Sequence, residues 1–158
     1  MSQEKFILAI DQGTTSSRAI VFNHDGQIVS SGQLEHEQIF PRAGWVEHDP
    51  IEIIKNTNEA IGQALARANI NRHQLEGVGI TNQRETTVIW NKNTGEPVYN
   101  AIVWQDTRTQ KVCDELAGDE GPDKYKDRVG LPLATYFAGP KAKWIFDNVD
   151  GPNEAAAA

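Results

Sequence analysis

The chain contains little cysteine and no excess of positive charge, and each shortage excludes a class of function. Cys113 is the only cysteine among the 158 residues, which excludes an intrachain disulfide and a zinc site built from several cysteines. We expect Cys113 to be a small buried side chain in a helix rather than a nucleophile. Acidic residues outnumber basic residues by 22 to 15, for a net charge of -7. This balance argues against binding to nucleic acid or to an anionic membrane surface, because such proteins usually present a basic face.

Long apolar segments and two common enzyme motifs are also missing. The first apolar run, FILAI at Phe6–Ile10, is too short for a membrane span or for the core of a signal peptide. We therefore expect a cytoplasmic protein without membrane insertion. Neither a G-x-x-x-x-G-K-S/T loop nor a G-x-S-x-G motif occurs, which excludes a Walker-type nucleotide site and an α/β-hydrolase nucleophile elbow. The length predicts one domain with one hydrophobic core.

The first part of the chain predicts three strands followed by a helix. Apolar runs at Phe6–Ile10, Arg18–Phe22 and Gln27–Gln33 are separated by short polar turns, a pattern typical of an antiparallel meander. The sequence DPIE at 49–52 combines an N-cap residue, proline at the first helical position and glutamate three residues after the cap. We expect this helix to reach about Ala68.

One face of the predicted helix is apolar and should pack on the core. Its large residues at helical spacing are Ile54, Ile61, Leu65 and Ala68, a stripe that indicates burial rather than a binding surface. A further strand is predicted at Gly77–Thr81, reached through the helix. An antiparallel meander, a crossover helix and another strand indicate an α/β domain.

The remainder of the chain predicts a hairpin and two helices. Strand-like runs at 86–90 and 97–103 flank a loop rich in Asn and Gly, as in an inserted hairpin. Asp106 or Thr107 should cap a helix to about Leu116, which the segment Gly118–Pro122 ends, and a last helix should start at Gly139-Pro140. Residues 152–158, which end in four alanines, have no core pattern and are expected to form a tail.

The turn at Asp11–Arg18 carries the densest group of reactive side chains. The sequence DQGTTSSR places a carboxylate, a glycine, four hydroxyls and a guanidinium between two buried strands. Backbone N–H groups of such a turn can face an anion, and glycine allows a phosphate to approach closely. Asp11 would then hold a hydrated Mg²⁺ or orient a water beside it, and Arg18 would neutralise charge on a phosphoryl group. An ordinary polar hairpin, whose hydroxyls bind local backbone groups, remains the alternative.

A second polar group follows the strand at Gly77–Thr81. Arg84 and Glu85 are adjacent, so in a regular strand they would point to opposite faces. Only a break in the backbone would let them share a ligand, and a small polyol would suit the pair, because each hydroxyl both donates and accepts. The alternative is an exposed charge pair at a strand end. Trp104 and Tyr136 stand near other strand and helix ends, where aromatic side chains either line a pocket or fill the core.

Five segments, in order and in register from about Lys5 to Gly151, resemble the FGGY carbohydrate kinase family. They are DQGTTSSR at 11–18, GWVEHDP at 44–50, GITNQRETT at 79–87, YNAIVWQ at 99–105, and Arg108. The first segment alone is shared by many sugar kinases with an actin-like ATPase domain. The NQRE run together with the later WQ is more specific, and it resembles the members of the family that phosphorylate glycerol. The segment QDTR at 105–108 varies among members at Asp106, so the resemblance assigns no role there.

The resemblance implies roles for residues in three of these segments and for Tyr136. Gly13, Thr14, Thr15, Ser16 and Arg18 would bind the phosphates of ATP, and Asp11 would organise Mg²⁺ through water. The glycerol-binding residues implied by the family are Arg84, Glu85 and Tyr136, which would bind the hydroxyls, and Trp104, which would pack on the carbon skeleton. The implied reaction is ATP-dependent phosphorylation of glycerol to sn-glycerol 3-phosphate. The implied fold is the ribonuclease H-like, actin-like ATPase domain, and the full-length protein is expected to be a homo-oligomer.

The family also implies parts that this chain lacks. Its members are longer, and the aspartate that acts as general base, the adenine pocket and the second lobe would all follow Ala158. We therefore expect residues 1–151 to form an incomplete N-terminal kinase domain that is inactive alone, since phosphoryl transfer needs groups on both sides of the substrate. Two alternatives remain open: another polyol or sugar kinase of the family, or a non-catalytic binding module.

Overall fold

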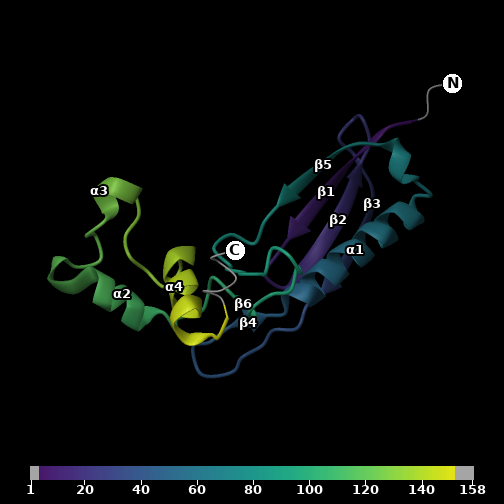
Figure 1. Ribbon diagram of the computed structural model, residues 1–158. Coiled ribbons are helices and arrows are strands. Elements are labelled where there is room, and N and C mark those ends of the chain that lie inside the picture. The colour runs from purple at the N-terminus through teal and green to yellow at the C-terminus, as the bar shows by residue number, and fades with distance from the viewer. Residues whose placement is uncertain (1–3, 152–158) are drawn as a thin grey trace. The chain divides into compact units, whose positions relative to one another are not determined.

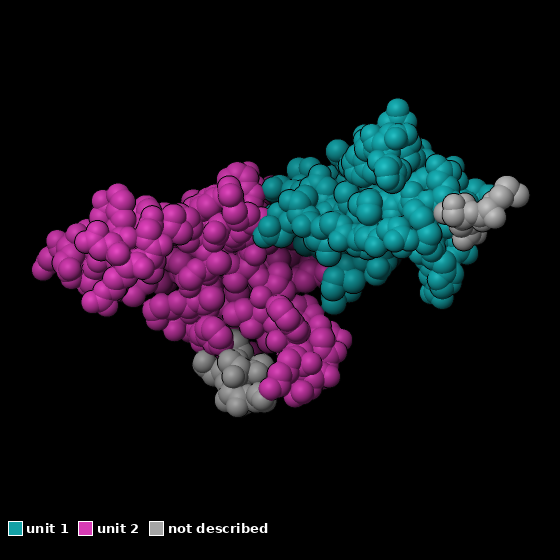
Figure 2. Space-filling view, turned by 90° about the horizontal axis from the view of Figure 1, so that it is seen from above, with its two compact units in different colours: residues 1–37, 51–83 teal, residues 38–50, 84–158 magenta. Residues whose placement is uncertain are grey.

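The computed structural model describes residues 4–151, which fall into two compact units. Unit 1 comprises Met1–Glu37 and Ile51–Gln83, and unit 2 comprises Gln38–Pro50 and Arg84–Ala158 (Figure 2). Length alone predicts one domain, whereas the residue contacts separate the chain into these two units. The predicted tail at 152–158 lies outside the described residues.

Unit 1 is built on a mixed sheet of four strands with the order β3-β2-β1-β5 (Figure 1). The strands are β1 (Phe6–Gln12), β2 (Ser16–Phe22), β3 (Ile28–Glu35) and β5 (Leu75–Thr81). β1 pairs antiparallel with β2 and β2 with β3, while β5 pairs in parallel with the other edge of β1. Parallel pairing needs a long connection, which includes α1 (Pro50–Arg67) and the short 3-10 helix η1 (Arg72–Gln74). The mixed sheet with its crossover helix confirms the predicted α/β class.

Helix α1 packs on the sheet through small side chains. Ala60 and Ala64 are fully buried and belong to the core of unit 1, whose other buried members are Phe6, Leu8, Ala19, Val21 and Ile70. A Cβ atom added to Gly32 of β3 would lie 2.2 Å from the carbonyl oxygen of Ala60. The glycine at 32 therefore permits the close approach of helix and strand.

The predicted core face of α1 is wrong at Ile54. Ile61, Leu65 and Ala68 do pack against the core, but Ile54 is 59% exposed. The face that meets the sheet is centred on the two alanines, which lie roughly 100° around the helix from Ile54 at 3.6 residues per turn. A stripe through the large aliphatic residues misses this face, because close packing on a glycine favours the smallest side chains.

Unit 2 has a two-stranded antiparallel sheet of β4 (Glu47–His48) and β6 (Ala101–Ile102). The predicted strands at 86–90 and 97–103 are much shorter than expected. Only β6 and two isolated bridges, Thr87 with Ile102 and Trp90 with Pro97, remain of them. β6 is paired on one side with β4 and on the other with Thr87, so the short ladder holds segments that come from distant parts of the sequence.

Three α-helices complete unit 2: α2 (Gln110–Ala117), α3 (Lys126–Val129) and α4 (Ala138–Asn148). The predicted cap at Asp106 or Thr107 is wrong, because α2 begins after Thr109. α2 ends at Gly118, whose φ of 53° lies in the left-handed region, as predicted. A short 3-10 helix, η2 (Gly118–Glu120), follows it, and neither η2 nor α3 was expected.

Two further expectations concern burial. Cys113 is buried in α2, as predicted, and burial raises the pKa of its thiol. A raised pKa lowers the thiolate fraction, which disfavours a nucleophilic role. Between residues 4 and 151, none of the helices has both the length and the apolar character needed to cross a membrane.

Candidate functional site

The turn between β1 and β2 brings together the residues predicted to bind phosphate. Asp11 lies near the end of β1, is half-buried, and stands opposite Arg18 in the register of the two strands. The N–H of Gly13 donates to the carbonyl oxygen of Ser16 at 3.0 Å, and a Cβ on Gly13 would lie 3.1 Å from that oxygen. A side chain at this position would force the Ser16 carbonyl to shift slightly, so the tight turn favours glycine, and the Gly13 N–H is engaged in closing the turn rather than facing an anion.

The hydroxyls of the turn differ in exposure. Ser16 is buried, and its Oγ accepts a hydrogen bond of 3.0 Å from Nε2 of Gln33. The same glutamine accepts a hydrogen bond of 3.0 Å from Nε of the exposed Arg18. Thr14 is half-buried and Thr15 is exposed. Of the three hydroxyls predicted to face phosphate, those of Thr14 and Thr15 are thus more accessible than that of Ser16.

Ser17 shows that part of the turn has a structural role. It is fully buried, and its Oγ donates to Oε1 of Gln12 at 2.8 Å. Thr57 of α1 donates to Ser17 at 3.3 Å and accepts from Gln12. This hydrogen-bonded group anchors the turn to α1, as the polar-hairpin interpretation expects for Ser17.

The predicted break between Arg84 and Glu85 is present. β5 ends at Thr81, and Glu85 has a φ of 63°, a left-handed conformation that is rare outside glycine and asparagine. Oε2 of Glu85 accepts a hydrogen bond of 2.8 Å from the N–H of Ala138, the first residue of α4. The positive end of the helix dipole stabilises a carboxylate in this position. The backbone strain at Glu85 is therefore offset by a bond at a helix N-terminus.

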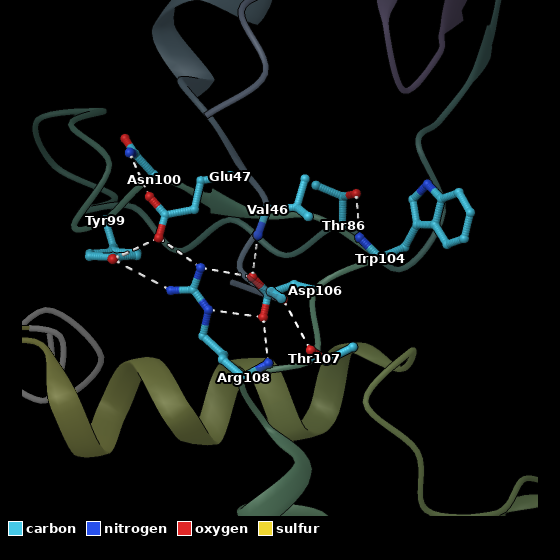
Figure 3. A network of polar contacts seen from close by, with 10 residues as sticks. Val46, Glu47, Thr86, Tyr99, Asn100, Trp104, Asp106, Thr107 and Arg108 are labelled. Atoms are coloured by element: carbon cyan, nitrogen blue, oxygen red, sulfur yellow. Dashed lines mark hydrogen bonds and ion pairs between the residues drawn. The ribbon is translucent and has the colours of Figure 1, made fainter. Parts of the chain in front are cut away.

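The aromatic residues predicted to line the pocket lie against each other. The rings of Trp104 and Tyr136 have centroids 5.9 Å apart and an interplanar angle of 67°. The N–H of Trp104 donates to Oγ1 of Thr86 at 3.3 Å (Figure 3). Since Thr86 follows Glu85 and Tyr136 stands two residues before Ala138, the structure brings Glu85, Trp104 and Tyr136 together in unit 2. Arg84 is exposed.

A buried charge cluster around Arg108 was not assigned any role from the sequence. The Arg108 side chain has no exposed surface, and its guanidinium forms ion pairs of 2.7 Å with Glu47 and 2.8 Å with Asp106 (Figure 3). The cation also lies 3.8 Å from the ring centroid of Trp45 and 4.8 Å from that of Trp144. Although burial lowers the pKa of Arg108, the hydrogen bonds that it donates to Asp106 and Glu47 outweigh this effect and raise the pKa.

Hydrogen-bond donors surround both carboxylates of this cluster. The hydroxyl of Tyr99 donates to Glu47 at 2.8 Å and the amide of Asn100 at 2.9 Å, while the N–H of Val46 donates to Asp106 at 2.6 Å. Burial and the Glu47 carboxylate raise the pKa of Tyr99. Asp106 therefore binds the N–H of Val46, the residue before β4, and Arg108 instead of capping a helix, which explains the later start of α2.

Comparison with models of known protein families gives a match over nearly the whole chain. The model of the FGGY family of carbohydrate kinases, N-terminal domain, matches residues 6–158. The chain belongs to the FGGY family. Among its relatives, glycerol kinases of Clavibacter michiganensis subsp. michiganensis and Paenarthrobacter aurescens are each 70% identical to it, over 155 and 154 residues.

Solved structures of FGGY kinases have the same fold. The structure of Plasmodium falciparum glycerol kinase with ADP matches 98% of the chain with a TM-score of 0.84 and 35% identity. Gluconate kinase from Lactobacillus acidophilus matches 92% with a TM-score of 0.81 at 20% identity, a likeness of fold alone. The chain spans 31% of the length of the two bacterial relatives and 30% of the Plasmodium protein.

Within residues 4–151, side chains that could bind a metal ion are not gathered into a cluster. The residues that the structure describes include no group of three or more His, Cys, Asp or Glu side chains that could hold a metal. Mg²⁺ commonly uses one or two carboxylates together with water and substrate phosphates. Asp11 is half-buried at the end of β1 next to the turn, so its carboxylate is of the kind that such a site uses.

Proposed function

We propose that the full-length protein transfers the terminal phosphoryl group of ATP to glycerol, giving sn-glycerol 3-phosphate and ADP. The observation that carries this proposal is the 70% identity to a glycerol kinase over 98% of the chain. The Plasmodium glycerol kinase with ADP, at 35% identity, supports the use of an adenine nucleotide. Residues 1–151 would be part of the N-terminal actin-like domain, and the second lobe would lie outside this chain.

Unit 2 would bind glycerol. Glu85, with one carboxylate oxygen fixed by the N–H of Ala138, would accept a hydrogen bond from a glycerol hydroxyl through the other oxygen. Arg84 would donate to a hydroxyl, and the Tyr136 hydroxyl would bind another. The face of Trp104, held against Tyr136, would cover the carbon skeleton. A pocket with fixed donors and acceptors favours a substrate that satisfies all of them, because unpaired buried polar groups are costly.

Unit 1 would bind the phosphates of ATP. Thr14 and Thr15 would donate from the β1–β2 turn, with Gly13 and Ser16 shaping it, and Arg18 would neutralise phosphate charge. Asp11 would hold Mg²⁺ through water. When bound, Mg²⁺ supplies positive charge that offsets the charge of the phosphates. The net charge of -7 does not attract a nucleotide at long range, so local donors have to supply the binding.

Substitution of Arg84 tests the proposed function. In the full-length protein, Arg84→Ala should raise the KM for glycerol about 10- to 100-fold, since a hydrogen bond to a charged group contributes about 1.5–3 kcal/mol. The KM for ATP should stay nearly constant. Arg128→Ala, which removes an exposed arginine of α3, is the matched control. An unchanged KM for glycerol in Arg84→Ala would refute the assignment of this residue.

A second candidate function is phosphorylation of another polyol or sugar. It is favoured by one observation: the same fold occurs in a gluconate kinase. The two candidate functions are distinguished by measuring ADP release with a panel of substrates: glycerol, longer polyols, pentuloses and gluconate. We expect glycerol to give the highest kcat/KM. If another compound gives a higher kcat/KM, that compound is the substrate instead of glycerol.

A further inference from the structure

Lys141 of α4 is a buried cation to which the proposed reaction gives no role. Its side chain has no exposed surface. An ammonium group without hydration is strongly destabilising unless other polar groups replace the lost water. Here Nζ donates to two backbone carbonyl oxygens, those of Tyr136 and of Phe137, the latter at 3.2 Å. The partners of Lys141 are therefore the two residues that immediately precede α4.

These two residues form the turn that carries the polyol-binding groups. Tyr136 contributes the ring that contacts Trp104, with 5.9 Å between centroids. Phe137 is the N-cap of α4, and its ring packs edge-on against Tyr136 at 5.2 Å. The next residue, Ala138, donates its N–H to Glu85. The ammonium group of Lys141 thus fixes the backbone that carries the Tyr136 ring. The same backbone leads into the Ala138 N–H, to which the Glu85 carboxylate is hydrogen-bonded.

The electrostatic surroundings of Lys141 agree with this role. Burial lowers its pKa to about 8, while the negative charges of Glu85 and Asp106 act in the opposite direction. Near pH 7 the side chain is therefore mostly a cation with three donors. A purely packing role would be served equally well by methionine or leucine, which need no hydrogen-bond partners.

We propose that Lys141 is a positioning residue of the polyol pocket: its buried Nζ holds the Tyr136–Phe137 turn, and through that turn it fixes the Tyr136 ring and the Ala138 N–H that binds Glu85. The proposal rests on the proposed function for the identity of the substrate. Lys141 touches neither substrate nor nucleotide in this account, so its loss affects the polyol alone.

The test uses Lys141→Met in the full-length protein. Methionine keeps most of the side-chain length but removes the donors. We expect the KM for glycerol to rise about tenfold, because the buried carbonyl oxygens of Tyr136 and Phe137 lose their donor. The KM for ATP should change by less than about twofold. Lys143→Met is the matched control, because Lys143 is two residues away, exposed, and paired with Asp147. Equal rises in both KM values, or no rise for glycerol, would overturn the proposal.

A double-mutant cycle with Tyr136→Phe separates positioning from a general loss of stability. If Lys141 acts through the Tyr136 turn, the combined variant should raise the KM for glycerol by less than the product of the two single effects. Multiplicative effects would contradict it. Should Lys141→Met be insoluble, Lys141→Gln, which keeps one donor group, should show the same split at a smaller amplitude. Insolubility of both variants would overturn the proposal, because it would show that the ammonium maintains the fold rather than the pocket.

The same measurements distinguish this proposal from the proposed function. If the unmodified enzyme prefers another polyol to glycerol, the proposed function fails, and the KM split is measured with that polyol. If glycerol is the substrate and Lys141→Met leaves its KM unchanged, only the role of Lys141 fails.

Discussion

At the scale of single residues, the buried charges of unit 2 have the largest predicted effects. Arg108 neutralises two carboxylates that are themselves buried. Arg108→Met should therefore destabilise the protein by about 3–5 kcal/mol, because Glu47 and Asp106 would stay buried without their cation. Unfolding in urea, followed by tryptophan fluorescence, measures the change, since the rings of Trp45 and Trp144 contact the guanidinium.

Arg42 provides the control for this prediction. Its cation also faces Trp45, at 4.9 Å from the ring centroid, but Arg42 is exposed. An exposed cation–π contact contributes about 0.5–1 kcal/mol, so Arg42→Met should cost no more than that. Similar losses in the two variants would show that the aromatic contacts, rather than the ion pairs, stabilise Arg108.

Lys141 gives a second residue-scale prediction, on the pH dependence of stability. Its pKa is lowered to about 8 in the folded protein, against about 10.4 for an unperturbed lysine. Between these values the unfolded chain binds more protons than the folded one, so this group makes the folded state more stable as pH rises. The free energy of unfolding of the unmodified protein, relative to Lys141→Met, should increase by about 2.5 kcal/mol from pH 8 to pH 10.4.

The comparison with Lys141→Met cancels Tyr99, whose raised pKa acts with the opposite sign and which is present in both proteins. Cys113 also has a raised pKa, but the charge of Lys141 lowers it, so both proteins should carry Cys113→Ala in this measurement. A flat difference between the two unfolding curves across this pH range would contradict the lowered pKa of Lys141.

At the scale of elements, the contact between α1 and β3 is the most sensitive to a change of one methyl group. Gly32→Ala would place a Cβ 2.2 Å from the Ala60 carbonyl oxygen, and this overpacking should destabilise unit 1 by about 1–3 kcal/mol. Gly62→Ala is the matched control in α1, since a Cβ there meets nothing within 4 Å. It should stabilise the helix by about 0.5–1 kcal/mol. Thermal unfolding of both variants tests the pair, and destabilisation by Gly62→Ala would contradict the described packing.

Element positions were predictable where local signals act alone. β1, β2, β3 and β5 overlap the predicted apolar runs, and α1 begins at Pro50, where proline and the preceding aspartate predict a helix start. The errors arise from tertiary contacts. Asp106 binds Val46 and Arg108 rather than a helix N-terminus, and Ile54 lies outside the face selected by Gly32 and the alanines.

At the scale of the whole molecule, the sequence predicts the candidate site better than the buried charge cluster around Arg108. The family motifs carry Arg84, Glu85 and Trp104, and the resemblance adds Tyr136. A break in the strand at Glu85 follows from the adjacency of Arg84 and Glu85, which a regular strand would point to opposite faces. Burial of Arg108 does not follow, because arginine is rarely fully buried and its partner Glu47 is 61 positions away in the sequence. The hydrogen bond by which the Gly13 N–H closes the turn also could not be predicted, because it depends on backbone geometry and not on the types of residue in the segment.

The last prediction concerns the activity of residues 1–158 by themselves. The chain spans 31% of the length of its bacterial relatives, so it would supply the phosphate turn and the polyol pocket without the rest of a kinase. General-base catalysis typically contributes about 100- to 10,000-fold, and positioning from the opposite side of the substrate adds to that. ATP-dependent phosphorylation of glycerol by the 158-residue chain should therefore be at least about 100-fold slower than by the full-length protein. A coupled assay of ADP release, with circular dichroism to verify that the chain is folded, makes the comparison. Turnover of the folded chain within tenfold of the full-length rate would show that the catalytic base lies inside these residues, and Glu85 and Asp11 would then be the first carboxylates to substitute.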